Sequence, residues 1–167
     1  IVKAVANEGK GIAEVLAAAF ERRHAARAPL QQAGARIDHL GIAVRSIDEA
    51  LRFYEGLLGM QVSLRESVDT EKVHAAILPL GASRIELLEA SEPDSVIAKF
   101  IAKRGEGLHH VAISVPDLNA VVGQLKTAGA KLLNEPRAGA GGHLYVFVHP
   151  ASTGGVLLEL IQSSSKQ

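Results

Sequence analysis

Two histidines in this chain lie at equivalent points of two similar stretches. Residues 37–44 (IDHLGIAV) are echoed 71 positions later by residues 108–115 (LHHVAISV), which makes His110 the counterpart of His39. Each stretch is followed by a turn and an amphipathic segment with helical spacing. Two equivalent imidazoles that face each other across a pseudo-twofold axis are suited to holding a metal ion.

Each copy also ends in a strand-like segment that carries one acid among aliphatic residues. Glu86 follows His39 by 47 residues, and Glu159 follows His110 by 49 residues. A carboxylate in such a strand is costly to bury unless it is paired or bound to a metal. A lone histidine or glutamate in a strand is more often structural, but these four obey one internal symmetry. We therefore predict that His39, Glu86, His110 and Glu159 form a divalent metal site.

The alternation of strand residues supports this prediction. His39 shares its face with Gly41 and Ala43, and His110 shares its face with Ala112 and Ser114. Small neighbours of this kind are expected beside a cleft that something must enter. His109 is one residue out of register and should face the aliphatic side or the rim. It stays open as an alternative ligand to His110.

The elements that would position these residues read as βαβββ, twice. We expect an α+β fold in which two fused βαβββ modules form one curved mixed sheet around a metal cleft, with an N-terminal helical extension. The boundaries are 36–90 for the first module, 107–162 for the second and 36–162 for the whole domain. The expected strands are 36–45, 60–66, 72–79, 84–89, 108–115, 130–134, 143–149 and 155–162, and the expected helices are 47–58, 95–102 and 117–128.

The remaining segments carry weaker signals. Residues 1–35 are rich in alanine and have apolar residues at helical spacing, so we expect a helical extension rather than a targeting segment, because its acidic residues disfavour targeting. Residues 163–167 form a short tail. The stretch 139–142 (GAGG) lacks the context of a phosphate-binding loop and is interpreted as a mobile loop beside the cleft.

Composition excludes several classes of function. Lys+Arg and Asp+Glu both number 18, so no bulk charge favours nucleic acid or a membrane surface. The chain has no Cys, which excludes disulfides, thiolate nucleophiles and Cys-ligated zinc. No apolar run approaches the roughly 20 residues of a membrane span. We expect a cytoplasmic protein with neither nucleic-acid nor membrane partners.

At these residues the chain resembles the vicinal oxygen chelate (glyoxalase/bleomycin resistance/dioxygenase) superfamily and, within it, the methylmalonyl-CoA epimerase family. The resemblance covers roughly residues 36–162. The superfamily pattern lies in 38–44 (DHLGIAV), 110–112 (HVA) and 158–160 (LEL). The likeness to the epimerases is carried by 85–89 (IELLE), 95–100 (SVIAKF), 105–110 (GEGLHH), 147–150 (FVHP) and 154–160 (GGVLLEL).

The resemblance implies an epimerase that interconverts (R)- and (S)-methylmalonyl-CoA by abstracting the C2 proton and forming a metal-stabilised enolate. It carries the ligand set over as His39, Glu86, His110 and Glu159, although some relatives have Gln at the place of Glu86. The implied metal is Co²⁺, with Mn²⁺, Ni²⁺, Zn²⁺ or Mg²⁺ as alternatives. Because members of the family commonly pair, a homodimer is expected.

Inversion at C2 requires acid/base groups on both faces of the substrate. Glu159 is the predicted catalytic group on one face. Some relatives carry a second glutamate whose place aligns with Ala75 here, a few residues after Glu71. This departure leaves Glu86 as the default second group. Basic residues of the expected helix 95–102 and its end could contact the CoA phosphates: Lys99, Lys103 and Arg104.

Three other functions remain open at this level. A glyoxalase-I-type isomerase or lyase uses the same kind of ligand set, and this alternative rests on fold analogy. A dioxygenase would use two His and one carboxylate for iron, which Glu86 makes less natural. A non-catalytic module that binds a small molecule would not need both histidines and both glutamates. Their presence therefore counts against this alternative.

Overall fold

The computed structural model describes residues 34–139 and 143–162. The predicted N-terminal helix and the 163–167 tail lie outside these ranges, as does nearly all of the 139–142 loop. The first module contains β1 (Arg36–Val44), α2 (Ile47–Tyr54), β2 (Leu64–Val68), β3 (Val73–Leu80) and β4 (Ser83–Ala90). After α3 (Val96–Arg104), the second contains β5 (Gly107–Ser114), α4 (Leu118–Thr127), β6 (Arg137–Ala138), β7 (Leu144–Val148), the 3₁₀ turn Pro150–Ser152 and β8 (Leu158–Gln162).

The strands form one curved mixed sheet in the order β2-β3-β4-β1-β5-β8-β7-β6. The two halves of this order mirror each other. Each module places its first strand, β1 or β5, at the centre of the sheet and next to its own last strand, β4 or β8. The centre is the antiparallel pair of β1 and β5. The predicted α+β fold of two βαβββ modules in a curved mixed sheet is confirmed.

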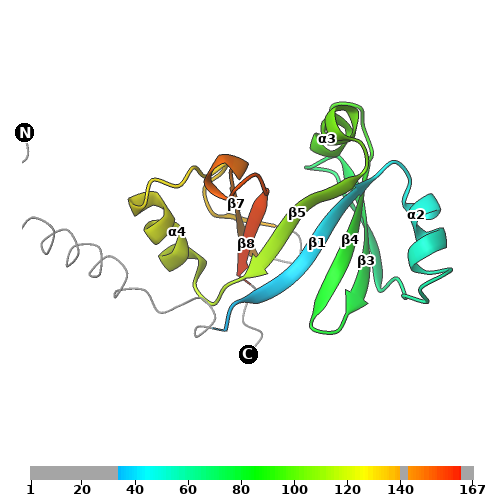
Figure 1. Cartoon of the computed structure of the whole chain (residues 1–167), viewed down its shortest axis with the longest axis horizontal. Helices are drawn as coiled ribbons and strands as arrows, with labels where there is room; N and C mark the ends of the chain where they lie inside the picture. The colour runs from blue at the N-terminus through cyan, green and yellow to red at the C-terminus, as the bar shows by residue number, and fades with distance from the viewer. Residues whose placement is uncertain (1–33, 140–142, 163–167) are drawn as a thin grey trace, which may run out of the picture.

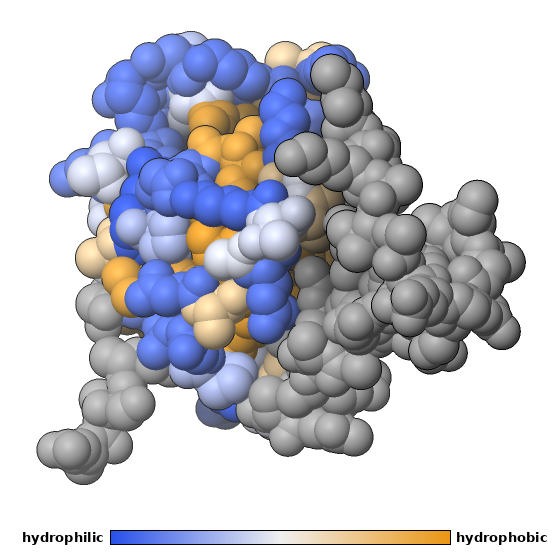
Figure 2. Space-filling view, turned by 90° about the vertical axis from the view of Figure 1, so that its left-hand side faces the viewer, coloured by the Kyte–Doolittle hydropathy of each residue, from blue (hydrophilic) through white to orange (hydrophobic). Residues whose placement is uncertain are grey.

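In the described part of the chain, three helices pack on the sheet. In Figure 1, α2 and α4 lie on its two flanks while α3 lies above the central strands. Ile47 and Leu51 of α2 share a buried cluster with Leu87 of β4. Leu118 of α4 shares another with Val146 of β7 and Leu160 of β8. From the α4 side, hydrophilic residues frame the hydrophobic ones that show between them (Figure 2). Helix α3 packs on the opposite face of the sheet, which is the one that carries the predicted site.

The internal symmetry extends to the helix starts. The backbone N–H of Ile47 donates to Glu89 Oε2 at 2.7 Å, and the N–H of Leu118 donates to Gln162 Oε1 at 2.7 Å. Each acceptor side chain lies at the end of its module's last strand. A helix start leaves backbone N–H groups without intrahelical partners, so both modules satisfy one in the same way.

Several expected boundaries were wrong, including the start of the last strand, which is Leu158 rather than 155. Helix α2 ends at Tyr54 rather than at 58, and Leu57 and Leu58 are exposed rather than part of its buried stripe. The first strand after α2 begins at Leu64, later than expected. Residues 130–134 form no strand beyond a single bridge from Leu132, and the two-residue β6 takes the edge position instead.

Candidate metal and catalytic site

The two predicted histidines meet at the centre of the sheet. His39 on β1 and His110 on β5 are each 4% exposed, and their Nε2 atoms lie 3.0 Å apart. Their rings meet edge to face, with centroids 5.2 Å apart. The strand alternation predicted this face correctly, since Ile42 and Val44 of β1 pack on the opposite side, under α2.

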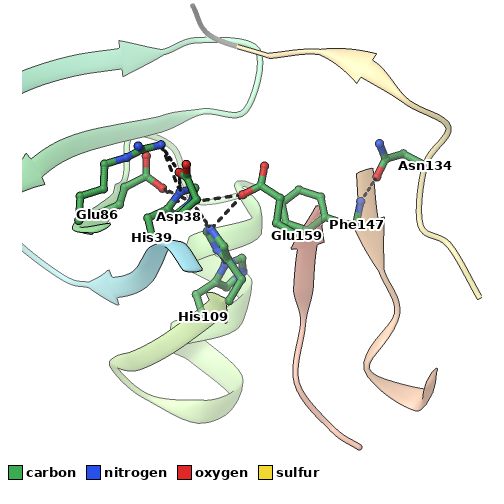
Figure 3. Close-up of polar contacts among 9 residues, drawn as sticks. Asp38, His39, Glu86, His109, Asn134, Phe147 and Glu159 are labelled. Carbon is green, nitrogen blue, oxygen red and sulfur yellow. Dashed lines mark hydrogen bonds and ion pairs between the residues drawn. The ribbon is translucent and has the colours of Figure 1, made fainter. Parts of the chain in front are cut away.

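The two predicted glutamates converge on the same point from the flanking strands (Figure 3). Glu159 Oε2 lies 3.2 Å from His39 Nε2 and 3.4 Å from His110 Nε2. Glu86 Oε2 lies 3.3 Å from His39 Nε2 and 3.9 Å from His110 Nε2. The structure therefore brings all four predicted residues together, two from each module.

The spacing of these donor atoms fits a shared divalent ion. Ligand atoms about 2.1 Å from one ion lie about 3.0–3.4 Å from each other, close to the separations above. His39, Glu86 and His110 each offer a ligand atom within 4.8 Å of the others. Two imidazoles and two carboxylates suit a borderline-hard dication, so the described residues contain a possible His/Glu metal site.

Gly41 is required by this convergence. It is paired with Glu86 of β4 on one side and with His110 of β5 on the other. A Cβ added at Gly41 would lie 2.2 Å from Cε1 of the His110 ring. The imidazole thus lies across a backbone that no side chain covers, which explains the small residue next to His39 on this face.

Electrostatics holds the site in a charged state. Burial acts to raise the pKa of Glu159, but hydrogen bonds from His110 and His39 outweigh it and lower that pKa to about 2. For His39, burial acts to lower the pKa, yet the hydrogen bonds to Asp38 and Glu159 raise it to about 9. Glu159 is therefore a carboxylate at neutral pH although it is only 6% exposed.

The sequence did not predict the contacts that Asp38 and His109 make with the site histidines. Asp38 Oδ1 accepts a hydrogen bond from Nδ1 of His39 at 2.9 Å, and Arg84 Nη2 lies 2.5 Å from the same carboxylate oxygen. Nδ1 of His109 lies 2.9 Å from Nδ1 of His110. The signal that could have found them is their position, because each immediately precedes one of the repeated histidines.

The expectation that His109 faces the aliphatic side or the rim was wrong. Its half-buried ring meets Phe100 of α3 edge to face at 5.0 Å, on the same side of the sheet as His110. A register shift in β5 breaks the alternation at this point. Neither ring nitrogen of His109 joins the four converging donor atoms.

The remaining candidates are not part of this cluster. Lys99, Lys103 and Arg104 are exposed on α3, and nothing among the described contacts selects one of them for a phosphate. His74 pairs with Ser67 at 2.6 Å, and His149 accepts from the N–H of Ala151 at 3.0 Å.

Comparison with known proteins identifies the family of this chain. The sequence profile of the Glyoxalase/Bleomycin resistance protein/Dioxygenase superfamily matches residues 38–147. The mitochondrial methylmalonyl-CoA epimerase of Homo sapiens is 38% identical over 130 residues, which are 77% of this chain and 74% of that protein. The chain belongs to the methylmalonyl-CoA epimerase family of this superfamily.

Two further proteins match over most of this chain. The uncharacterized protein YqjC of Bacillus subtilis is 38% identical over 133 residues, covering 79% of this chain and 95% of YqjC. A solved methylmalonyl-CoA epimerase in complex with methylmalonyl-CoA and NH4+ superposes with a TM-score of 0.74 at 37% identity, covering 78% of this chain and 96% of that one. Within the described ranges, no helix is long and apolar enough to cross a membrane.

Proposed function

We propose that this protein interconverts (R)- and (S)-methylmalonyl-CoA. The observation that carries the proposal is the cluster of two histidines and two glutamates, contributed equally by both modules, in a chain of the epimerase family. An inversion at carbon needs proton transfer on both faces of the substrate. A site with one carboxylate from each module provides this.

We propose that His39, Glu86, His110 and Glu159 hold the divalent ion, with Co²⁺ favoured over Mn²⁺, Ni²⁺, Zn²⁺ and Mg²⁺. When bound, such an ion withdraws electron density from the oxygens that flank C2 and makes the C2 proton more acidic. The buried carboxylate of Glu159 and the uncovered backbone at Gly41 support this assignment. The choice among these metals is left to measurement of the metal content of the purified protein.

Glu159 and Glu86 are the proposed acid/base pair. The carboxylate of Glu159 takes the C2 proton on one face, and its low pKa in the metal-free protein keeps it in the form that a base requires. Glu86 occupies the equivalent place in the other module and delivers a proton to the opposite face. The pseudo-twofold relation of β4 and β8 supports placing these two groups on opposite sides of C2.

Proton exchange tests both assignments. Each enantiomer of methylmalonyl-CoA is incubated in deuterated water with cobalt-loaded protein, and deuterium at C2 is measured together with the configuration of the product. The wild type should exchange and invert. Glu159→Gln and Glu86→Gln should each lower inversion by about 10²–10⁴-fold, and each should retain exchange from the enantiomer whose proton the remaining carboxylate removes.

Glu55→Gln is the matched control, because Glu55 is exposed at the end of α2. It should leave both rates unchanged. Absence of exchange in the metal-loaded wild type would refute the epimerase function. Full inversion by Glu86→Gln would show that the second proton carrier is another group.

We further propose that the protein acts as a homodimer. Three exposed hydrophobic side chains at and just after α2, Phe53, Leu57 and Leu58, support an apolar contact surface. Sedimentation of Leu57→Glu should then show a shift toward monomer relative to wild type. A cytoplasmic location stays a prediction from sequence.

A further inference from the structure

The central strand pair departs from regular pairing at two symmetric points. Between β1 and β5 the register runs from Ile37 opposite Ile113 directly to His39 opposite Ala112, so Asp38 is skipped. It runs from Gly41 opposite His110 directly to Ile42 opposite Leu108, so His109 is skipped. An extra residue in one strand bends that strand and re-aims its side chains.

The two skipped residues make equivalent contacts. Each immediately precedes a site histidine, and each places a polar atom 2.9 Å from Nδ1 of that histidine. The Nδ1 atom of each histidine contacts the residue before it. The Nε2 atoms of His39 and His110 face each other and the two glutamates. The bulges therefore orient both rings toward the centre, in the way that outer hydrogen bonds orient metal-binding histidines.

The two contacts differ in charge. Asp38 is 5% exposed, and its carboxylate oxygen Oδ1 contacts both Nδ1 of His39 and the guanidinium of Arg84. His109 instead presents an imidazole nitrogen to His110, and its ring packs edge to face on Phe100. A carboxylate that accepts from a histidine raises the basicity of the other ring nitrogen. A neutral imidazole does so less.

We propose that Asp38 and His109 are matched positioning residues that aim the two histidines and make them unequal donors, with His39 the stronger. This inference rests on the metal site of the proposed function and goes beyond it. Arg84 completes the pair on the Asp38 side by holding the carboxylate, and Phe100 completes it on the His109 side by packing on the ring. The asymmetry thus arises within a symmetric fold from the identity of one residue per module.

Cobalt binding tests the inference without turnover. Full-length metal-free protein is titrated with Co²⁺, and both the affinity and the visible d–d absorption are recorded. Asp38→Asn keeps the size of the side chain and removes its charge, and it should weaken cobalt binding about 10–100-fold and shift the d–d bands. His109→Phe keeps an aromatic ring against Phe100 and should weaken binding by a smaller factor.

Matched variants separate positioning from folding. Asp48→Asn alters an exposed aspartate on α2, paired with Arg65, and should change neither the affinity nor the spectrum. Asp38→Glu restores the charge and should recover affinity relative to Asp38→Asn. Circular dichroism of every metal-free variant should match the wild type.

Two results would overturn the inference. One is an unchanged affinity and spectrum in Asp38→Asn, which would show that the carboxylate does not act through His39. The other is a loss in His109→Phe as large as that in Asp38→Asn, which would remove the asymmetry. A wild type that binds cobalt but neither exchanges nor inverts methylmalonyl-CoA refutes the proposed function alone, whereas one that binds no divalent ion refutes both.

Discussion

At the scale of the residue, the site is a set of buried charges that stabilise one another. His39 contacts the carboxylates of Asp38, Glu86 and Glu159, all within 3.3 Å of its ring nitrogens. A buried charge is tolerated only when it is paired, so each member depends on the others. The metal-free protein should consequently show a pH dependence that follows this cluster.

We expect the metal-free protein to lose stability at alkaline pH. The pKa of His39 is about 9 in the folded state and about 6.5 when unfolded. The stabilisation is therefore complete below pH 6.5 and disappears as the pH rises through 9. Urea unfolding in a chelator should give a free energy of unfolding lower at pH 9.5 than at pH 6, by on the order of 2–3 kcal/mol.

The contribution of Glu159 to stability has the opposite pH dependence to that of His39. Its folded pKa of about 2 lies below its ordinary value, so its contribution is present above that value and is lost as the pH falls toward 2. The same unfolding series should decline between pH 5 and pH 3. His39→Gln should flatten the alkaline limb and, because His39 helps to lower the pKa of Glu159, should also reduce the acid decline. A wild type more stable at pH 9.5 than at pH 6 would contradict the charge pairing.

At the scale of the element, position in the sheet decides what each residue can do. Gly41 lies between Glu86 and His110 in the register, with the His110 ring over it. Strand alternation correctly predicted which face His39 and His110 share. It failed for His109, because a bulge moves that residue beside His110, and a bulge depends on how two distant strands pair rather than on local sequence.

Gly41→Ala should damage the site from the backbone. The new methyl group would displace the His110 ring, so cobalt affinity should fall and the free energy of unfolding should drop by about 1–3 kcal/mol, as in an overpacked core. Thermal unfolding and a cobalt titration measure the two effects.

Gly123→Ala is the control for glycine replacement. Gly123 is exposed on α4, and an added Cβ meets nothing within 4 Å. Alanine there should raise stability by about 0.5–1 kcal/mol and leave cobalt binding unchanged. If Gly41→Ala bound cobalt as tightly as Gly123→Ala does, the close approach of His110 to Gly41 would not matter for metal binding.

At the scale of the whole molecule, the sheet curves far enough for a side chain of edge strand β6 to reach the turn between β2 and β3. Arg137 on edge strand β6 contacts Glu71, in the turn between β2 and β3, at 3.0 Å, and Arg137 also donates to the Tyr145 hydroxyl at 2.6 Å. The two modules are thus joined at the centre by β1 and β5 and at the rim by an ion pair. The four proposed metal ligands, two from each module, would provide a third connection when an ion is bound.

Arg137→Met should have a small effect on stability. Both charged side chains are about half exposed, and such ion pairs contribute about 0–1 kcal/mol. A double-mutant cycle with Glu71→Gln measures the coupling by urea unfolding. A coupling of several kcal/mol would show that the rim contact holds the modules together.

Metal binding should stabilise the fold far more than the rim contact does. An ion that binds only the folded state adds RT ln(1 + [L]/Kd), which is about 2.7 kcal/mol at a hundredfold excess over Kd. The Tm should rise with cobalt and fall with a chelator. His110→Gln should lose most of this shift, and an equal shift in that variant would place the ion elsewhere.

The sequence by itself determined the repeat, the two faces of its strands and the four residues that converge. These follow from local pattern, because alternation and a 71-residue echo specify which side chains share a face. Only the tertiary structure decided the roles of Asp38, His109 and Gly41, and the junction of Glu71 with Arg137. Each of these depends on the register between strands that are distant in sequence, and local residue preferences do not specify that register.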